Sequence, residues 1–109
     1  MKPGLSVLID DDPLVRMTWK QAAKAARAEL RTFDSIAAFE AAVKEIPFDV
    51  AIYIDSNLGS GVRGEDYARE LRERGFKCIH LATGSAEIFS LERLNWLSGI
   101  RDKTPPFGA

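Results

Sequence analysis

The sequence predicts an α/β fold in which a doubly wound, five-stranded parallel sheet carries helices on both faces. Short apolar runs of strand length alternate along the chain with longer stretches whose apolar residues recur at helical spacing. Four of the apolar runs stop abruptly at polar residues, as strands of such a sheet do at their carboxyl ends. The length of 109 residues is that of one domain, so we expect residues 1–109 to form a single unit.

The first half of the chain is expected to supply two strands and two helices. The apolar run Leu5–Ile9 indicates a buried strand, and Asp12 is placed to cap the helix that follows it. Glu29–Phe33 indicates a short second strand. The pair Asp34–Ser35 then caps a second helix, which we expect to run as far as Pro47.

The second half is expected to supply three strands and two helices. Three glycines indicate a loop over Ser56–Gly64. The next helix is expected to have a solvated face with two ion pairs, Glu65–Arg69 and Glu70–Arg74. The expected elements are a strand over Val50–Ile54, a helix from Glu65 to just before Gly75, a strand over Cys78–Ala82, a weaker helix around Glu87–Leu94 and a strand over Ser98–Asp102.

The composition excludes several classes of partner. Fifteen Lys and Arg residues against sixteen Asp and Glu give a net charge of −1, which argues against nucleic acid as a direct partner. The single cysteine, Cys78, has no partner within the chain for a disulfide, as is usual in a reducing compartment. No apolar run approaches the ~18 residues of a membrane span. We therefore expect a cytoplasmic domain with no membrane insertion.

Polar residues at four strand ends predict one site, because the carboxyl ends of parallel strands meet at one edge of the sheet. They are Asp10 with Asp11, then Asp55, Thr83 and Lys103, at intervals of 45, 28 and 20 residues from Asp10 onward. Two carboxylates at about 4 Å repel by on the order of 4 kcal/mol at an effective dielectric near 20. A raised pKa or a divalent cation relieves this repulsion, and hard oxygen ligands favour Mg²⁺. A carboxylate in such a site is a known type of phosphoryl acceptor.

These motifs resemble those of two-component response-regulator receiver domains. Val7–Arg16 resembles the opening of that family, and Ile52–Leu58 with Gly64 resembles its phosphoacceptor segment. Leu81–Gly84 resembles its switch-threonine segment, and Lys103 falls where the family keeps a lysine. The three intervals are also close to the family pattern, so the resemblance extends over essentially the whole chain. It implies a flavodoxin-like receiver fold.

The resemblance assigns a role to each site residue. It makes Asp55 the aspartate that accepts the phosphoryl group, Thr83 a residue that bonds the phosphoryl oxygens, and Lys103 their cationic partner. It implies a magnesium site formed by Asp10, Asp11, Asp55 and the backbone carbonyl of Asn57.

The function implied is that of a phosphoacceptor signalling domain rather than an enzyme, although it assists its own phosphoryl transfer and dephosphorylation. Its donor would be a phosphohistidine on a sensor histidine kinase or a histidine phosphotransfer protein. The alternative is a degenerate receiver that binds a partner without phosphorylation. A phosphatase of the haloacid-dehalogenase type is disfavoured, because Asn57 stands where those enzymes place a second acid.

Three features depart from the family pattern. Thr104 follows Lys103 where the family usually has a proline after a cis bond, so the sequence leaves this peptide open between cis and trans. Ile100 stands where an aromatic residue is frequent. No residues remain for a fifth helix, an ending that resembles the shortened receivers at the C-terminus of hybrid sensor kinases. We expect a monomer in which the Pro105–Phe107 tail covers part of the helix over 87–94.

Overall fold

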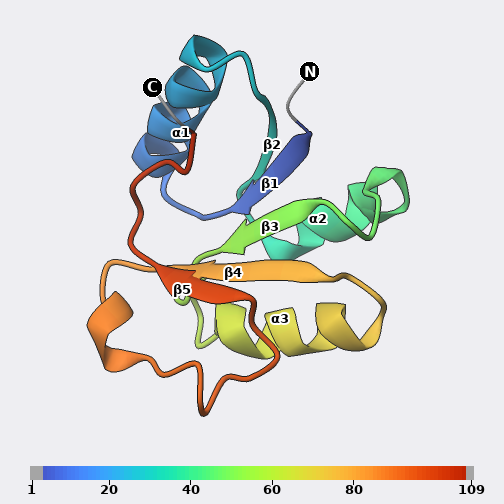
Figure 1. Cartoon of the computed structure of the whole chain (residues 1–109), viewed down its shortest axis with the longest axis vertical. Helices are drawn as coiled ribbons and strands as arrows, with labels where there is room; N and C mark the ends of the chain where they lie inside the picture. Colours follow the sequence, from blue (N-terminus) through green and yellow to red (C-terminus); the bar gives the residue numbers. More distant parts are fainter. Residues whose placement is uncertain (1–3, 108–109) are drawn as a thin grey trace.

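The computed structural model describes residues 4–107 and confirms the doubly wound α/β fold, with a five-stranded parallel sheet in the order β2-β1-β3-β4-β5 (Figure 1). The strands are β1 (Leu5–Ile9), β2 (Glu29–Phe33), β3 (Ala51–Ile54), β4 (Cys78–Ala82) and β5 (Gly99–Arg101). The α-helices are α1 (Pro13–Ala25), α2 (Ile36–Ala42) and α3 (Gly64–Glu73), with 3₁₀ turns η1 (Val43–Glu45) and η2 (Ala86–Ile88). No helix within the described range is long and apolar enough to cross a membrane.

The register of the two central strands determines where the site forms. Ile9 of β1 pairs with Ile54 of β3, so the next residues along each strand, Asp10 and Asp55, emerge side by side. The Asp55 amide donates to the carbonyl of Ile9 at 2.9 Å, which extends the ladder by one residue beyond the strands. The sheet therefore delivers two carboxylates to adjacent positions at one edge.

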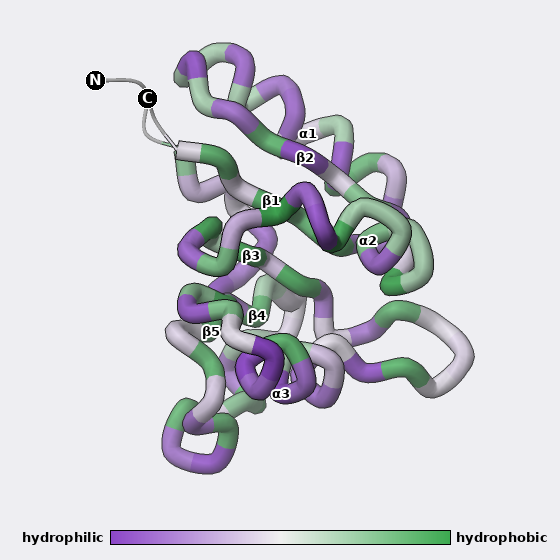
Figure 2. The backbone as a smooth tube through the Cα atoms, turned by 90° about the vertical axis from the view of Figure 1, so that its right-hand side faces the viewer, coloured by the Kyte–Doolittle hydropathy of each residue, from purple (hydrophilic) through white to green (hydrophobic). Residues whose placement is uncertain are grey.

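The two faces of the sheet are covered unequally. The larger hydrophobic cluster joins α2 and α3 to one face, with Phe39 and Leu71 fully buried against the strands. The smaller cluster, on the other face, is built around Trp19 of α1 with Leu8 and Tyr53. In Figure 2, hydrophobic and hydrophilic segments alternate along α1, as expected of a helix with one buried face.

The C-terminal segment returns from β5 to α1 (Figure 1), and the ring of Phe107 packs edge-on against Trp19 at a centroid distance of 6.1 Å. The expectation that this tail covers the segment over 87–94 is therefore wrong, because Phe107 joins the cluster on the α1 face. Residues 4–107 contain no cis peptide bond, so the Lys103–Thr104 peptide is trans.

The helix expected around Glu87–Leu94 is also wrong, since this segment contains only η2 and irregular turns. Two physical reasons account for this. The side chain of Ser85 makes no capping hydrogen bond, and Ile88 and Leu91 are 73% and 45% exposed, so these two apolar side chains add little burial that would stabilise a helix. Isolated helices this short are marginal without tertiary packing. Three α-helices, rather than four, therefore occur among the described residues.

Two further expectations about helices need correction. The second helix ends as an α-helix at Ala42 and continues only as η1, before Pro47 is reached. In α3, Glu65 is buried and bonded to Ser56 instead of facing solvent beside Arg69. Arg74 pairs with Glu40 of α2, at 2.6 Å, and not with Glu70. Glu65 and Arg74 thus have tertiary partners, while Arg69 pairs within the helix with Glu73, at 3.8 Å.

Candidate functional site

Lys103 reaches two buried carboxylates at the carboxyl edge of the sheet. Its Nζ lies 3.0 Å from Oδ2 of Asp10 and 3.3 Å from Oδ1 of Asp55. Asp10 is fully buried and Asp55 nearly so, whereas Asp11 is exposed. Carboxylate oxygens of Asp10, Asp11 and Asp55 all lie within 4.8 Å of one another. One cation thus partly neutralises a cluster of three acids.

The electrostatics of this cluster favour an incoming cation. Burial raises the pKa of Asp55, and the neighbouring charge of Asp10 raises it further, against the opposing effects of Lys103 and the Asn57 backbone. Burial acts to lower the pKa of Lys103, but its contacts with Asp10 and Asp55 outweigh this effect and raise it. Lys103 therefore stays protonated, but its single positive charge does not balance the carboxylates around Asp55.

The residues after β1 have distinct tasks. The Asp10 Oδ1 atom accepts a hydrogen bond from the Asp12 amide at 2.9 Å, and the Asp10 carbonyl accepts one from Arg16 at 2.8 Å. Asp12 caps α1 by accepting a bond from the Leu14 amide at 2.9 Å, as its position in the sequence predicts. These contacts fix the backbone from which Asp10 and Asp11 project.

The loop after β3 folds back closely on Asp55. The Asn57 side chain accepts a bond from the Gly59 amide at 3.1 Å, and the Gly64 amide donates to the Ser56 carbonyl at 2.9 Å. A Cβ on Gly64 would lie 1.8 Å from the carbonyl oxygen of Asp55, so only glycine lets α3 begin this close to the acid.

Thr83 lies on the neighbouring strand end, and its amide donates to the Arg101 carbonyl at 3.0 Å. The side chain is buried, and its Oγ1 accepts a bond from the Ser85 amide at 3.2 Å. The fold thus brings Asp10, Asp55 and Lys103 into direct contact. Thr83 stands at the same edge of the sheet, where its side chain bonds to the Ser85 amide rather than to these three side chains.

The acid cluster fits a hard divalent cation. Oδ2 of Asp10 is buried and lies 3.0 Å from the Lys103 ammonium, with which it forms an ion pair. No described residue donates a well-oriented hydrogen bond to it. Carboxylate and carbonyl oxygens are the ligands that Mg²⁺ and Ca²⁺ take. Asp10, Asp11 and Asp55, with the Asn57 carbonyl on the adjoining loop, supply such a set, and no thiol or imidazole ligand belongs to it.

Sequence reasoning missed three polar contacts, of which one reaches the backbone of the site lysine. Ser56 donates to Glu65 at 3.0 Å, directly after Asp55. The indole of Trp96 donates to the Glu65 carbonyl at 2.8 Å, and that of Trp19 donates to the Lys103 carbonyl at 2.8 Å. Nothing in the local pattern signals these contacts, because two of them join segments far apart along the chain.

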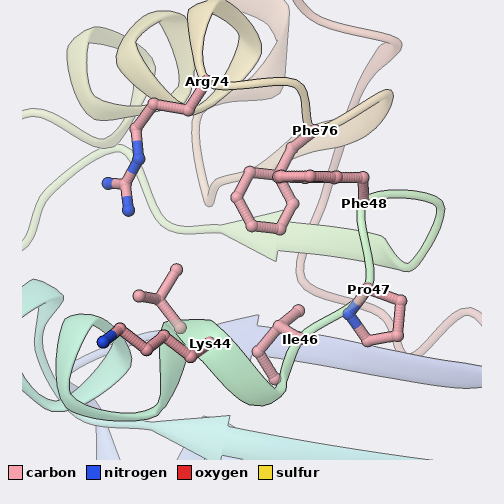
Figure 3. A pocket seen from close by; sticks show the side chains of 7 residues that line it. Lys44, Ile46, Pro47, Phe48, Arg74 and Phe76 are labelled. Atoms are coloured by element: carbon pink, nitrogen blue, oxygen red, sulfur yellow. The ribbon is translucent and has the colours of Figure 1, made fainter.

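Two hollows lie away from the acid cluster. The first, of about 320 Å³, lies before β3 and β4 at the opposite end of the sheet. Figure 3 shows Phe48 and Phe76 in its wall, with Lys44 and Arg74 on the other side. The second, of about 520 Å³, lies beside Glu65 and the irregular segment over 88–94. Neither is lined by Asp10, Asp55 or Lys103.

The sequence matches no protein-family model and no curated protein. Solved structures, in contrast, resemble the chain over nearly its whole length. A CheY-like receiver domain from Methylobacillus flagellatus gives a TM-score of 0.77 at 16% identity, over 96% of this chain and 90% of that one. A CheY-like receiver domain protein from Methanospirillum hungatei JF-1 gives a TM-score of 0.72 at 16% identity, over 94% of this chain and 82% of that one. Full-length FixJ from B. japonicum gives a TM-score of 0.76 at 20% identity, over 99% of this chain and 52% of that one. The chain therefore adopts the receiver fold of response regulators.

Proposed function

We propose that this chain is a phosphoacceptor receiver domain of two-component signal transduction, in which Asp55 accepts a phosphoryl group. The contact of Lys103 with both Asp10 and Asp55 is the observation that carries the proposal. This arrangement places an acceptor carboxylate, Asp55, next to a cationic side chain. The neighbouring acids Asp10 and Asp11 are available to bind a metal ion. The receiver fold supports the same conclusion.

In the proposed reaction, an oxygen of Asp55 forms a bond to phosphorus while the bond from phosphorus to the donor imidazole nitrogen breaks. The imidazole leaves with the electron pair of that bond and takes a proton. Mg²⁺, when bound by Asp10, Asp11, Asp55 and the Asn57 carbonyl, supplies positive charge for the phosphoryl oxygens. Lys103 turns from the carboxylates to a phosphoryl oxygen, which its position at 3.3 Å from Asp55 supports.

Thr83 is proposed to bond the phosphoryl group after transfer. Its hydroxyl oxygen already accepts the Ser85 amide, so its own proton remains available for donation to an anion. The proposed donor is a phosphohistidine on a sensor histidine kinase or a histidine phosphotransfer protein, in the cytoplasm. The near-neutral net charge of −1 supports a protein partner rather than nucleic acid.

The test is phosphorylation by a small phosphodonor in the presence of Mg²⁺, followed by intact-mass measurement. We expect a single phosphoryl addition on the wild-type chain and none on Asp55→Asn. Asp49→Asn, which removes an exposed acid from the turn before β3, is the matched control and is expected to react like wild type. No addition to the wild-type chain would favour the degenerate receiver, which binds a partner without phosphorylation.

A further inference from the structure

Lys103 follows the short strand β5 and lies in a turn that has little regular structure of its own. The Thr104 amide donates to Asp102 at 2.9 Å, and Arg101 donates to the Thr104 carbonyl at 3.0 Å. Both bonds are local. Among the described residues, the hydrogen bond that ties the 102–104 backbone to another element comes from Trp19, whose Nε1 lies 2.8 Å from the Lys103 carbonyl oxygen.

Trp19 is itself enclosed by other side chains. It is fully buried on α1, and its ring contacts Tyr53 of β3 edge-on at 5.2 Å and Phe107 at 6.1 Å. A buried indole N–H requires an acceptor, since leaving it unpaired costs about 1–3 kcal/mol. The Lys103 carbonyl is that acceptor, so the contact joins a fixed point in the core to the backbone of the site lysine.

We propose that Trp19 is a positioning residue for Lys103. By fixing the backbone at Lys103, it sets where the ammonium meets Asp10 and Asp55, and this role rests on the proposed function. A lysine side chain has four rotatable bonds, so a displaced backbone spreads its ammonium over many positions. Misplacement by about 1 Å can cost on the order of 10²-fold in rate.

The first variant is Trp19→Phe, which keeps an aromatic ring and removes the N–H donor. We expect the rate of phosphorylation by a small phosphodonor to fall about tenfold, while the dissociation constant for Mg²⁺ changes by less than about twofold. The matched control is Trp96→Phe, which removes an indole bond of the same 2.8 Å length, to Glu65, and leaves Lys103 untouched. We expect the control to phosphorylate at close to the wild-type rate.

A second variant guards against loss of folding in Trp19→Phe. In the Trp96→Phe background, the remaining tryptophan is replaced biosynthetically by β-(3-benzothienyl)alanine, which keeps the bicyclic shape and carries sulfur in place of N–H. The same fall in rate is expected. An unchanged rate in this chain would overturn the proposal, because only the hydrogen bond has been removed.

Double-mutant cycles with Lys103→Ala separate positioning from general stability. If Trp19 acts through Lys103, Trp19→Phe changes the phosphorylation rate by less than about twofold once Lys103 is alanine. The two substitutions are also expected to be non-additive in the free energy of unfolding without metal, where Trp96→Phe and Lys103→Ala are additive. Additivity of Trp19→Phe with Lys103→Ala in both measurements would overturn the proposal. If wild type accepts no phosphoryl group, the proposed function fails and the unfolding cycle alone decides the coupling.

Discussion

At the scale of single residues, the three acids of the cluster differ in how much water reaches them. Asp10 and Asp55 are buried and share the one ammonium of Lys103, whereas Asp11 is exposed. Water screens Asp11, so its charge costs the fold little. The ionised form of Asp55, in contrast, is disfavoured by burial and by Asp10, which is why its pKa is raised. Removing one acid or the other should therefore have different consequences.

We expect Asp55→Asn to raise the free energy of unfolding in metal-free buffer at neutral pH, and Asp11→Asn to leave it nearly unchanged. The pKa of folded Asp55 is raised, so its ionisation costs stability above that pKa, and the cost disappears as the pH falls below the unfolded value. Both variants should bind Mg²⁺ at least about tenfold more weakly, since each loses a charged ligand. Denaturation and calorimetric titration measure the two effects, and equal Mg²⁺ affinity in Asp11→Asn and wild type would remove Asp11 from the site.

At the scale of elements, strand ends were predictable and long-range contacts were not. Asp10, Asp55, Thr83 and Lys103 each follow a short apolar run, and a parallel sheet brings such ends to one edge whatever the loops between them do. The bond from Trp19 to Lys103 spans 84 residues, and no local pattern encodes it. The segment over 87–94 has helical spacing, but it lacks a capping side chain and leaves Ile88 and Leu91 exposed, so periodicity alone overstates its helicity.

Helices α2 and α3 are joined through Glu40, whose partner Arg74 was expected from the sequence to pair with Glu70. Glu40 of α2 accepts a bond from Arg74 at 2.6 Å and another from the Tyr67 hydroxyl of α3. The bond from Arg74, and then that from Tyr67, lowers the pKa of Glu40. Burial, and then the bond to the Glu40 carboxylate, raises the pKa of Tyr67. Ionised Glu40 therefore holds the two helices together.

We expect Glu40→Gln to lower the free energy of unfolding at pH 7 by about 0.5–1 kcal/mol, a modest value because the pair is partly exposed. The folded pKa of Glu40 is depressed, so its contribution is complete above the unfolded pKa and is lost as the pH falls through the folded one. The difference between wild type and variant should thus shrink in acid. Urea denaturation at a series of pH values measures it, with the exposed Glu92→Gln as control. A difference that stays constant down to pH 2 would contradict this account.

At the scale of the whole molecule, the fold presents two unlike faces. Two helices and the larger core cover one face of the sheet, while α1 and the returning tail cover part of the other. The tail contacts both the core and the residue behind the site lysine, because Phe107 packs on Trp19 and the Trp19 indole donates to the Lys103 carbonyl. The site lysine is therefore in contact, through Trp19, with both helix α1 and the C-terminal segment.

The exposed apolar side chains are dispersed, and this bears on self-association. They lie on α1 (Leu14, Met17), before β3 (Phe48), in the loop after β3 (Val62) and in the irregular segment after β4 (Ile88, Leu91). A stable interface buries about 800 Å² on each partner around an apolar centre. Among the described residues, the segment between β4 and β5 forms no α-helix that could present such a centre.

We therefore propose that the chain is a monomer before and after activation, with its effect directed at a kinase or phosphotransfer partner. Light scattering at several concentrations, with Mg²⁺ and with or without beryllofluoride as a phosphoryl mimic, is expected to give the monomer mass of 12.1 kDa in each case. Asp55→Asn is the control for site-specific activation. A dimer that forms with beryllofluoride in wild type, and not in Asp55→Asn, would show that activation creates an interface. Loss of that dimer in Leu91→Glu would then place the interface on the irregular segment, because Leu91 is 45% exposed there and a buried carboxylate at its centre would be costly.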